Sequence, residues 1–184
     1  ALLVGGLLAA LIAFLIGWPV LRLRGDYLAI ATLGFSEIIR IVITNAQSWT
    51  NGALGIKDIP ALNDVRYIFI ATAITFLFVT CLINSSYGRA FKAIREDEIA
   101  AEAMGVGLFK HKCMAFMLSA FFAGIGGGLY ATLLGTVDPK NFLFTLTYNF
   151  LLIIVLGGMG SITGSMLGSI IVTAGLEYLR VFDE

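Results

Sequence analysis

The chain contains 184 residues, with 12 Lys or Arg, 12 Asp or Glu and one His, so its formal net charge is zero. Hydrophobic residues make up 59% and charged residues 13%, against about 45–50% and 25% in soluble domains. So little charge cannot cover a water-facing surface, which argues against a soluble enzyme. A neutral chain without a basic stripe also argues against nucleic-acid binding, and the apolar content excludes disorder. The composition indicates a polytopic membrane protein.

The chain opens at Ala1 directly in an apolar run. No basic segment precedes this run and no small-residue cleavage site follows it, so a signal peptide is a poor interpretation. We expect residues 1–184 to form a single transmembrane domain, the C-terminal part of a longer chain whose N-terminal part carries further spans.

Four apolar stretches are long enough to cross a bilayer, which requires roughly 20 mostly apolar residues. They cover residues 1–21, 27–48, 67–88 and 113–137. A fifth stretch, residues 141–176, is charge-free over a length that would give one helix of about 54 Å, against a hydrocarbon core of about 30 Å. We therefore predict a break within residues 157–161. This gives an all-α polytopic bundle of about six membrane-embedded segments, of which the last two can be short or re-entrant.

Lysine and arginine concentrate on one side of these spans. The connection over residues 84–112 holds five of the twelve, and Arg22 and Arg24 lie on the same side by alternation. The positive-inside rule makes that side cytoplasmic. The opposite loops cover residues 49–66 and 136–140.

Sequence motifs for catalysis are missing from the chain. It contains no phosphate-binding loop, no paired zinc-ligand motif and no nucleophile elbow, so no sequence motif supports an enzymatic function. We expect no cofactor or metal in this chain.

The cytoplasmic connection over residues 85–112 is long, charged and helix-prone. Residues 96–104 are rich in Glu and Ala and predict a short helix, with Gly105 as the left-handed residue that ends it. A short helix at the membrane surface suits docking onto a cytoplasmic partner. The alternative is a solvated loop that only joins two spans.

This connection resembles the coupling loop of ABC importer permeases, whose signature is Glu-Ala-Ala, three residues, then Gly. Ala100, Ala101 and Gly105 keep that spacing, while Ile99 stands at the Glu position. The whole chain resembles the LivM-type subunit of the branched-chain amino-acid permeases, a family of binding-protein-dependent transport permeases. The stretches that carry this resemblance cover residues 21–40, 50–60, 88–105 and 155–161.

The resemblance implies a transport subunit that moves Leu, Ile or Val across the bacterial-type inner membrane by alternating access. It implies a LivH-type second permease subunit, two cytoplasmic ATPase subunits that hold ATP and Mg, and a periplasmic substrate-binding protein, with the lipid bilayer around the permease and no nucleic acid. The coupling residues that it implies are Arg89, Arg95, Glu96, Glu98, Ala100, Ala101 and Gly105.

Two charges lie inside the second predicted span. Glu37 and Arg40 are three residues apart and share one helical face, where they can pair with each other. Charges are costly within a span, so we expect them to face protein or water. They form either a polar wall of the translocation path or a structural ion pair between helices. The other candidates for the path are the glycines of the predicted break, Gly157, Gly158 and Gly160.

Glycines also recur every four residues in two predicted segments. Gly124 and Gly128 lie in one of them, and Gly164 and Gly168 in the other. This small-xxx-small spacing lets helix backbones approach closely, so we interpret these residues as packing positions.

Other functions stay open on the sequence alone. A permease of the same superfamily for urea, amides or sugars is one alternative. A stand-alone secondary transporter or channel is another, and it would predict an inverted repeat. The outer loop over residues 50–63 either contacts a periplasmic binding protein or is only a connector.

Overall fold

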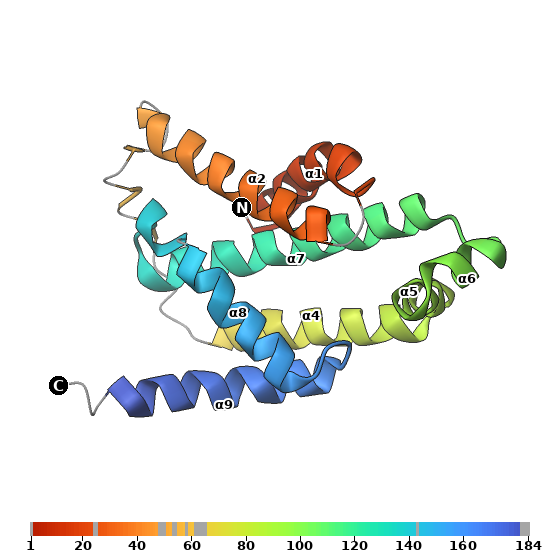
Figure 1. The fold of residues 1–184 in the computed structure, drawn as a ribbon. Helices are drawn as coiled ribbons and strands as arrows, with labels where there is room; N and C mark the ends of the chain where they lie inside the picture. The colour runs from red at the N-terminus through yellow and green to blue at the C-terminus, as the bar shows by residue number, and fades with distance from the viewer. Residues whose placement is uncertain are drawn as a thin grey trace. The chain divides into compact units, whose positions relative to one another are not determined.

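The computed structural model describes residues 2–23, 26–47, 51–52, 55–57, 59–60, 66–142 and 144–180. Arg24, Trp49 and Thr50, which entered the predictions above, lie outside this set. The chain divides into two compact units, Ala1–Asp138 and Pro139–Glu184 (Figure 1). The first holds α1 (Leu2–Val20), α2 (Asp26–Asn45), α4 (Arg66–Asn84), α5 (Ser86–Glu96), α6 (Glu98–Ala103) and α7 (Leu108–Leu134). The second holds the short 3-10 helix η2 (Pro139–Phe142), α8 (Phe144–Gly157) and α9 (Ile162–Arg180).

Four helices in the described part of the chain are long and apolar enough to cross a membrane, namely α1, α2, α4 and α7. They confirm the four predicted spans, and the two largest differences in their boundaries have local causes. Helix α7 begins at Leu108, five residues early, because the basic residues 110–112 continue the helix. Its 27 residues give about 40 Å, so one end extends beyond a hydrocarbon core of about 30 Å. Helix α4 ends at Asn84 because Ser85 caps a new helix.

The second unit is a helical hairpin with its break where the sequence predicts it. Helix α8 has only 14 residues, or about 21 Å, which makes it shorter than a full span. Gly158 and Gly160 adopt φ of 89° and 91°, a conformation that favours glycine. The Ser161 Oγ accepts a hydrogen bond from the Gly164 amide at 3.0 Å and so caps the start of α9.

Glycine packing joins α1 and α7, which run antiparallel through the first unit (Figure 1). A Cβ added at Gly124 would lie 2.8 Å from the Ala9 Cβ and 3.0 Å from the Gly5 carbonyl oxygen. A Cβ at Gly128 would lie 2.6 Å from the Leu2 Cδ2. The structure thus has the close helix approach that the glycine spacing predicts, with the α1 backbone as the neighbour at Gly124.

The hairpin of the second unit is closed in the same way. A Cβ added at Gly164 would lie 1.9 Å from the Gly157 carbonyl oxygen, and one at Gly168 would lie 2.9 Å from the Ile153 carbonyl oxygen. Gly157, which the sequence suggested for the translocation path, also lies in the close α8–α9 contact.

Two loops predicted to lie on the same side of the membrane contact each other. Ile56 and Val137 exchange two backbone hydrogen bonds of 2.9 Å, and the Ile59 amide donates to the Gly135 carbonyl at 3.0 Å. The connection after α2 therefore lies beside the turn after α7. This agrees with the alternating topology that the sequence predicts.

The glycine contact between α1 and α7 gives a first prediction. Gly124→Ala should destabilise the permease by about 1–3 kcal/mol, because the new methyl group has to displace backbone atoms of α1. Gly126→Ala is the matched control, since a Cβ there meets nothing within 4 Å and Ala favours the helix. Thermal unfolding of the detergent-solubilised protein measures both. Equal midpoints for the two variants would contradict the close contact.

Candidate coupling segment and polar pair

The chain turns sharply between α4 and α5. The Ser85 side chain accepts a hydrogen bond from the Gly88 amide at 3.4 Å, which caps α5. A Cβ added at Gly88 would lie 2.1 Å from the Ile83 carbonyl oxygen, so the corner requires glycine at this position. Helix α5 was not predicted from the sequence, and its cap and this glycine are the signals that could have indicated it.

Helix α6 is short and capped at both ends. The Asp97 Oδ1 accepts hydrogen bonds from the Ile99 amide at 2.8 Å and from the Ala100 amide at 3.0 Å. Asp97 has extended backbone, so the helix begins at Glu98 instead of Glu96, where it was predicted to start. Its N-terminal cap thus comes from a residue that the prediction had placed inside the helix.

A Schellman motif ends α6. Gly105 has a φ of 84°, which confirms it as the left-handed residue that ends the helix. The Val106 amide donates to the Ala101 carbonyl at 3.0 Å, and the Gly105 amide donates to the Glu102 carbonyl at 2.9 Å. Hydrogen bonds thus fix both ends of α6, and with them the direction in which the chain enters and leaves the helix.

An ion pair ties α6 to the start of α7. The Lys112 Nζ lies 2.6 Å from the Glu98 Oε1, and the two side chains are 20% and 43% exposed. The Phe91 ring of α5 also contacts the His111 ring edge-on, with centroids 6.2 Å apart. Lys112 was not among the residues that the sequence suggested for this segment. Its pairing with a residue 14 positions earlier is a tertiary contact that no local pattern shows.

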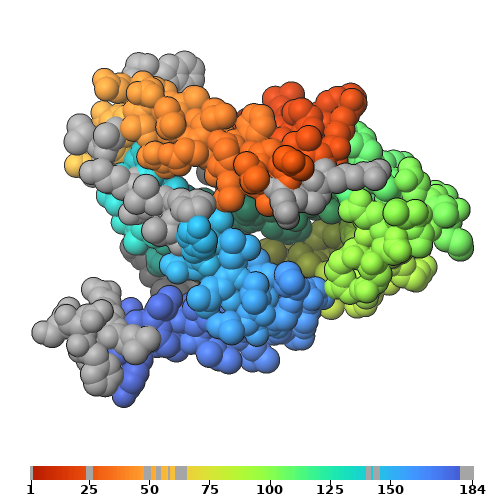
Figure 2. All heavy atoms as spheres, in the orientation of Figure 1, coloured from red at the N-terminus to blue at the C-terminus, as the bar shows by residue number. Residues whose placement is uncertain are grey.

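Two large apolar side chains are exposed on α6 and its C-terminal cap residue, beside the exposed Glu102. Ile99 and Met104 are 77% and 85% exposed, and Ala100 is exposed as well. Ala101 is only 4% exposed and is therefore covered by its own chain. Of the two adjacent alanines suggested for coupling, only Ala100 is thus exposed on the surface of the chain. Figure 2 shows α5 and α6, in green, gathered at one end of the first unit.

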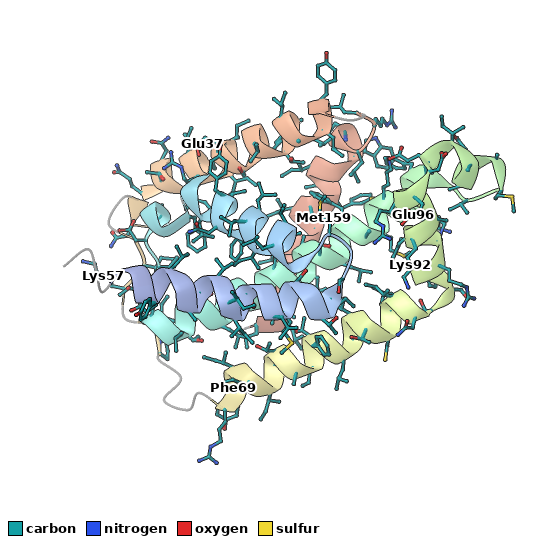
Figure 3. All side chains as sticks on the ribbon, turned by 60° about the horizontal axis from the view of Figure 1, so that its bottom comes forward. Glu37, Lys57, Phe69, Lys92, Glu96 and Met159 are labelled. Carbon is teal, nitrogen blue, oxygen red and sulfur yellow. The ribbon has the colours of Figure 1, made fainter. Side chains whose placement is uncertain are left out.

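The charged residues of α5 are exposed, and three of them have partners within the helix. Arg89 donates to the Ser86 Oγ at 2.9 Å, and Arg95 forms an ion pair with Glu96. Figure 3 shows Lys92 and Glu96 on this helix. These contacts are within α5 and involve no residue of α6.

Glu37 and Arg40 form the ion pair that their spacing predicts. Their side chains are 47% and 27% exposed, and the Arg40 Nε donates to both carboxylate oxygens at 3.0 Å. The pair does not line the cavity of about 360 Å³ that α2 encloses with α1 and α7. Figure 3 shows Glu37 on α2, well away from Lys92 and Glu96. The structure therefore brings the coupling candidates together but keeps this polar pair apart from them.

The candidate residues can make non-covalent contacts, but they do not form a metal site. Within the described part of the chain, no three His, Cys, Asp or Glu side chains gather in a way that could hold a metal ion. The arrangement is that of a polytopic all-α membrane protein with two short capped helices, α5 and α6, at the end of its spans. Residues 1–182 match the family described as branched-chain amino acid transport system, permease component, and the chain belongs to this family.

Relatives support this assignment. The chain is 38% identical to the high-affinity branched-chain amino acid transport system permease protein LivM of Escherichia coli K12, over 98% of the chain and 51% of the relative. It is 32% identical to the LivH permease protein of the same system and organism, over 56% and 34%. It is 34% identical to the guanosine ABC transporter permease protein NupQ of Bacillus subtilis 168, over 42% and 26%.

The chain spans about half the length of LivM, and no solved structure matches it. The match to LivM covers nearly the whole chain, whereas the matches to LivH and NupQ cover only parts of it. The chain is thus similar to LivM along both of its compact units.

The ion pair between Glu98 and Lys112 gives a second prediction. Glu98→Lys or Lys112→Glu alone should raise amide hydrogen exchange in Glu98–Ala103 about two- to fivefold, because partly exposed pairs contribute up to about 1 kcal/mol. The charge-swapped double variant should restore most of the protection. Glu102→Lys makes the same charge change on α6 away from Lys112 and should leave exchange unchanged. Lack of rescue in the double variant would rule out the pairing.

Proposed function

We propose that this chain is part of a permease subunit of an ATP-driven importer for branched-chain amino acids. The observation that carries the proposal is the similarity to LivM over 98% of the chain. The exposed Ile99 and Met104 support it, because two large apolar side chains exposed at the end of the spans suit docking onto a partner protein.

The partners of this importer follow from the proposed function. A LivH-type subunit would form the translocation path together with this chain, and two ATPase subunits would bind ATP and Mg outside it. A periplasmic binding protein would deliver the substrate. The basic connection over residues 84–112 supports a cytoplasmic position for α5 and α6 in the inner membrane. The loops joined by Ile56 and Val137 would then face the periplasm.

Coupling between ATP hydrolysis and transport would pass through α6. ATP binding moves the ATPase subunits, and a helix seated on them transfers that movement to the spans. The caps at Asp97 and Gly105 favour transfer of the movement over bending of the loop. The Glu98–Lys112 pair connects the helix to α7.

The polar residues suited to the translocation path are Glu37, Arg40, Gly158 and Gly160. Glu37 and Arg40 neutralise each other and are 47% and 27% exposed, so they suit a water-facing wall or a contact with the second permease subunit. Gly158 and Gly160 interrupt the hairpin helices, and such breaks supply free backbone groups to polar substrates in other transporters.

The third prediction concerns the substrate. The full-length permease, reconstituted in vesicles with its ATPase and binding-protein partners, should take up labelled leucine, isoleucine and valine only with ATP present. Unlabelled guanosine should not compete, because the similarity to the guanosine permease covers only 42% of the chain. Uptake that guanosine blocks and leucine does not would contradict the proposed substrate. Uptake without ATP would contradict the importer class.

The fourth prediction concerns docking. Ile99→Glu and Met104→Glu should weaken binding of the ATPase subunits at least about tenfold, since a buried apolar side chain contributes about 1.5–3 kcal/mol to association. Neither side chain is buried in the chain itself, so insertion and abundance should be retained. Copurification of the ATPase subunits and substrate-stimulated ATP hydrolysis are the measurements.

Leu23→Glu is the matched control for docking. Leu23 is 41% exposed in the turn after α1, predicted on the same side of the membrane but outside α6. It should leave copurification unchanged. Full copurification of the ATPase subunits with both α6 variants would show that this segment is only a connector.

A further inference from the structure

An apolar groove runs along one face of the α1–α7 pair. It has a volume of about 480 Å³, and its lining includes Ala10, Phe14, Phe109, Met114, Met117 and Phe121. The α7 residues of the lining span Phe109 to Phe121, which is about 18 Å along the helix. This is close to half of a hydrocarbon core of about 30 Å, the depth of one leaflet. The groove therefore has the length of a lipid chain in a single leaflet.

Two cations lie at one end of this groove. Lys110 is part of its lining, next to Phe109. The Arg22 guanidinium lies 5.6 Å from the centre of the Trp18 ring and 5.8 Å from that of Phe109, over both rings. The turn after α1 and the first turn of α7 thus bring Arg22 and Lys110 to the end of the groove that Phe109 marks, which we call its mouth. Neither cation pairs with a carboxylate whose side chain the structure describes.

The rest of the groove lining contains no carboxylate that could neutralise these cations. Apart from Lys110, its lining consists of apolar and thiol side chains from α1 and α7. Met114 and Met117 are flexible and adapt to irregular apolar ligands. The mouth therefore attracts an anion while the body attracts a hydrocarbon chain. Trp18, half exposed beside the mouth, is a residue type favoured where a bilayer meets water.

We propose that this groove binds one anionic phospholipid. The acyl chain lies against Phe14, Met117 and Phe121, and the phosphate lies between Arg22 and Lys110. Arginine donates two parallel hydrogen bonds to phosphate, and basic sites beside transmembrane helices are suited to anionic headgroups. A zwitterionic phospholipid carries no net charge to match the two cations. The site is independent of the transported substrate and of the ATPase subunits.

Trp18 makes the site measurable by fluorescence. The experiment uses the full-length permease, with its other tryptophans replaced by Phe, in phosphatidylcholine vesicles. Brominated phosphatidylglycerol or brominated phosphatidylcholine is added at equal mole fractions, and quenching of Trp18 reports the lipid beside it. Phosphatidylglycerol should quench Trp18 the more strongly. Its preference should fall about fivefold in Lys110→Gln, the factor that one basic residue contributes near an anionic surface.

Two further variants separate the charge from the groove. Lys57→Gln removes one charge from the loop at the other end of the spans and should leave the preference unchanged. Ala10→Phe fills the groove and should reduce quenching by both lipids. The proposal would be overturned if both lipids quenched Trp18 equally in the protein without these variants. It would also be overturned if Lys57→Gln and Lys110→Gln lost the preference for phosphatidylglycerol to the same extent. Absence of quenching by either lipid would show that protein covers this face instead.

Discussion

The contact between α1 and α7 determines where the other parts of the first unit lie. Lipid tails are as apolar as leucine, so helices in a bilayer associate by close van der Waals packing and by hydrogen bonds. Gly124 allows the α7 backbone to meet the α1 backbone at Gly5 and Gly6. This contact brings the end of α1 to the start of α7, where Trp18 meets Phe109 edge-on with ring centroids 5.8 Å apart.

Helix α7 then connects the two ends of the unit. Its first turns carry Lys112, which pairs with Glu98 of α6, and its last residues lead into Gly135 and Val137, which bond to the loop after α2. A continuous helix is stiff along its axis, because each residue is held by a backbone hydrogen bond one turn away. In an importer, a movement at α6 would therefore reach the opposite loops through α7. The proposed lipid site lies along the same helix pair.

The spans could be predicted from the sequence because hydrocarbon requires long apolar helices, and Gly105 could be predicted because a left-handed helix end favours glycine. The face of α6 could not be predicted. Six residues from Glu98 to Ala103 make fewer than two turns, so Ala100 and Ala101 are equivalent in sequence until tertiary contacts bury one of them. The close contact of Gly157 with Gly164 could not be predicted either, because glycine serves both turns and close packing and its sequence position does not show which partner it meets.

The pair on α2 follows from a balance of charge within an apolar helix. An Arg or Asp at mid-span costs about 2.5–3.5 kcal/mol on insertion scales, and pairing at i, i+3 offsets part of this because each charge has a counter-charge one turn away. Glu37 and Arg40 satisfy each other, yet 47% of the Glu37 side chain stays uncovered by the chain. Lipid would leave the outer carboxylate lone pairs without donors. We therefore expect this face of α2 to meet water or a polar surface of another subunit, which sets it apart from the apolar groove on the α1–α7 pair.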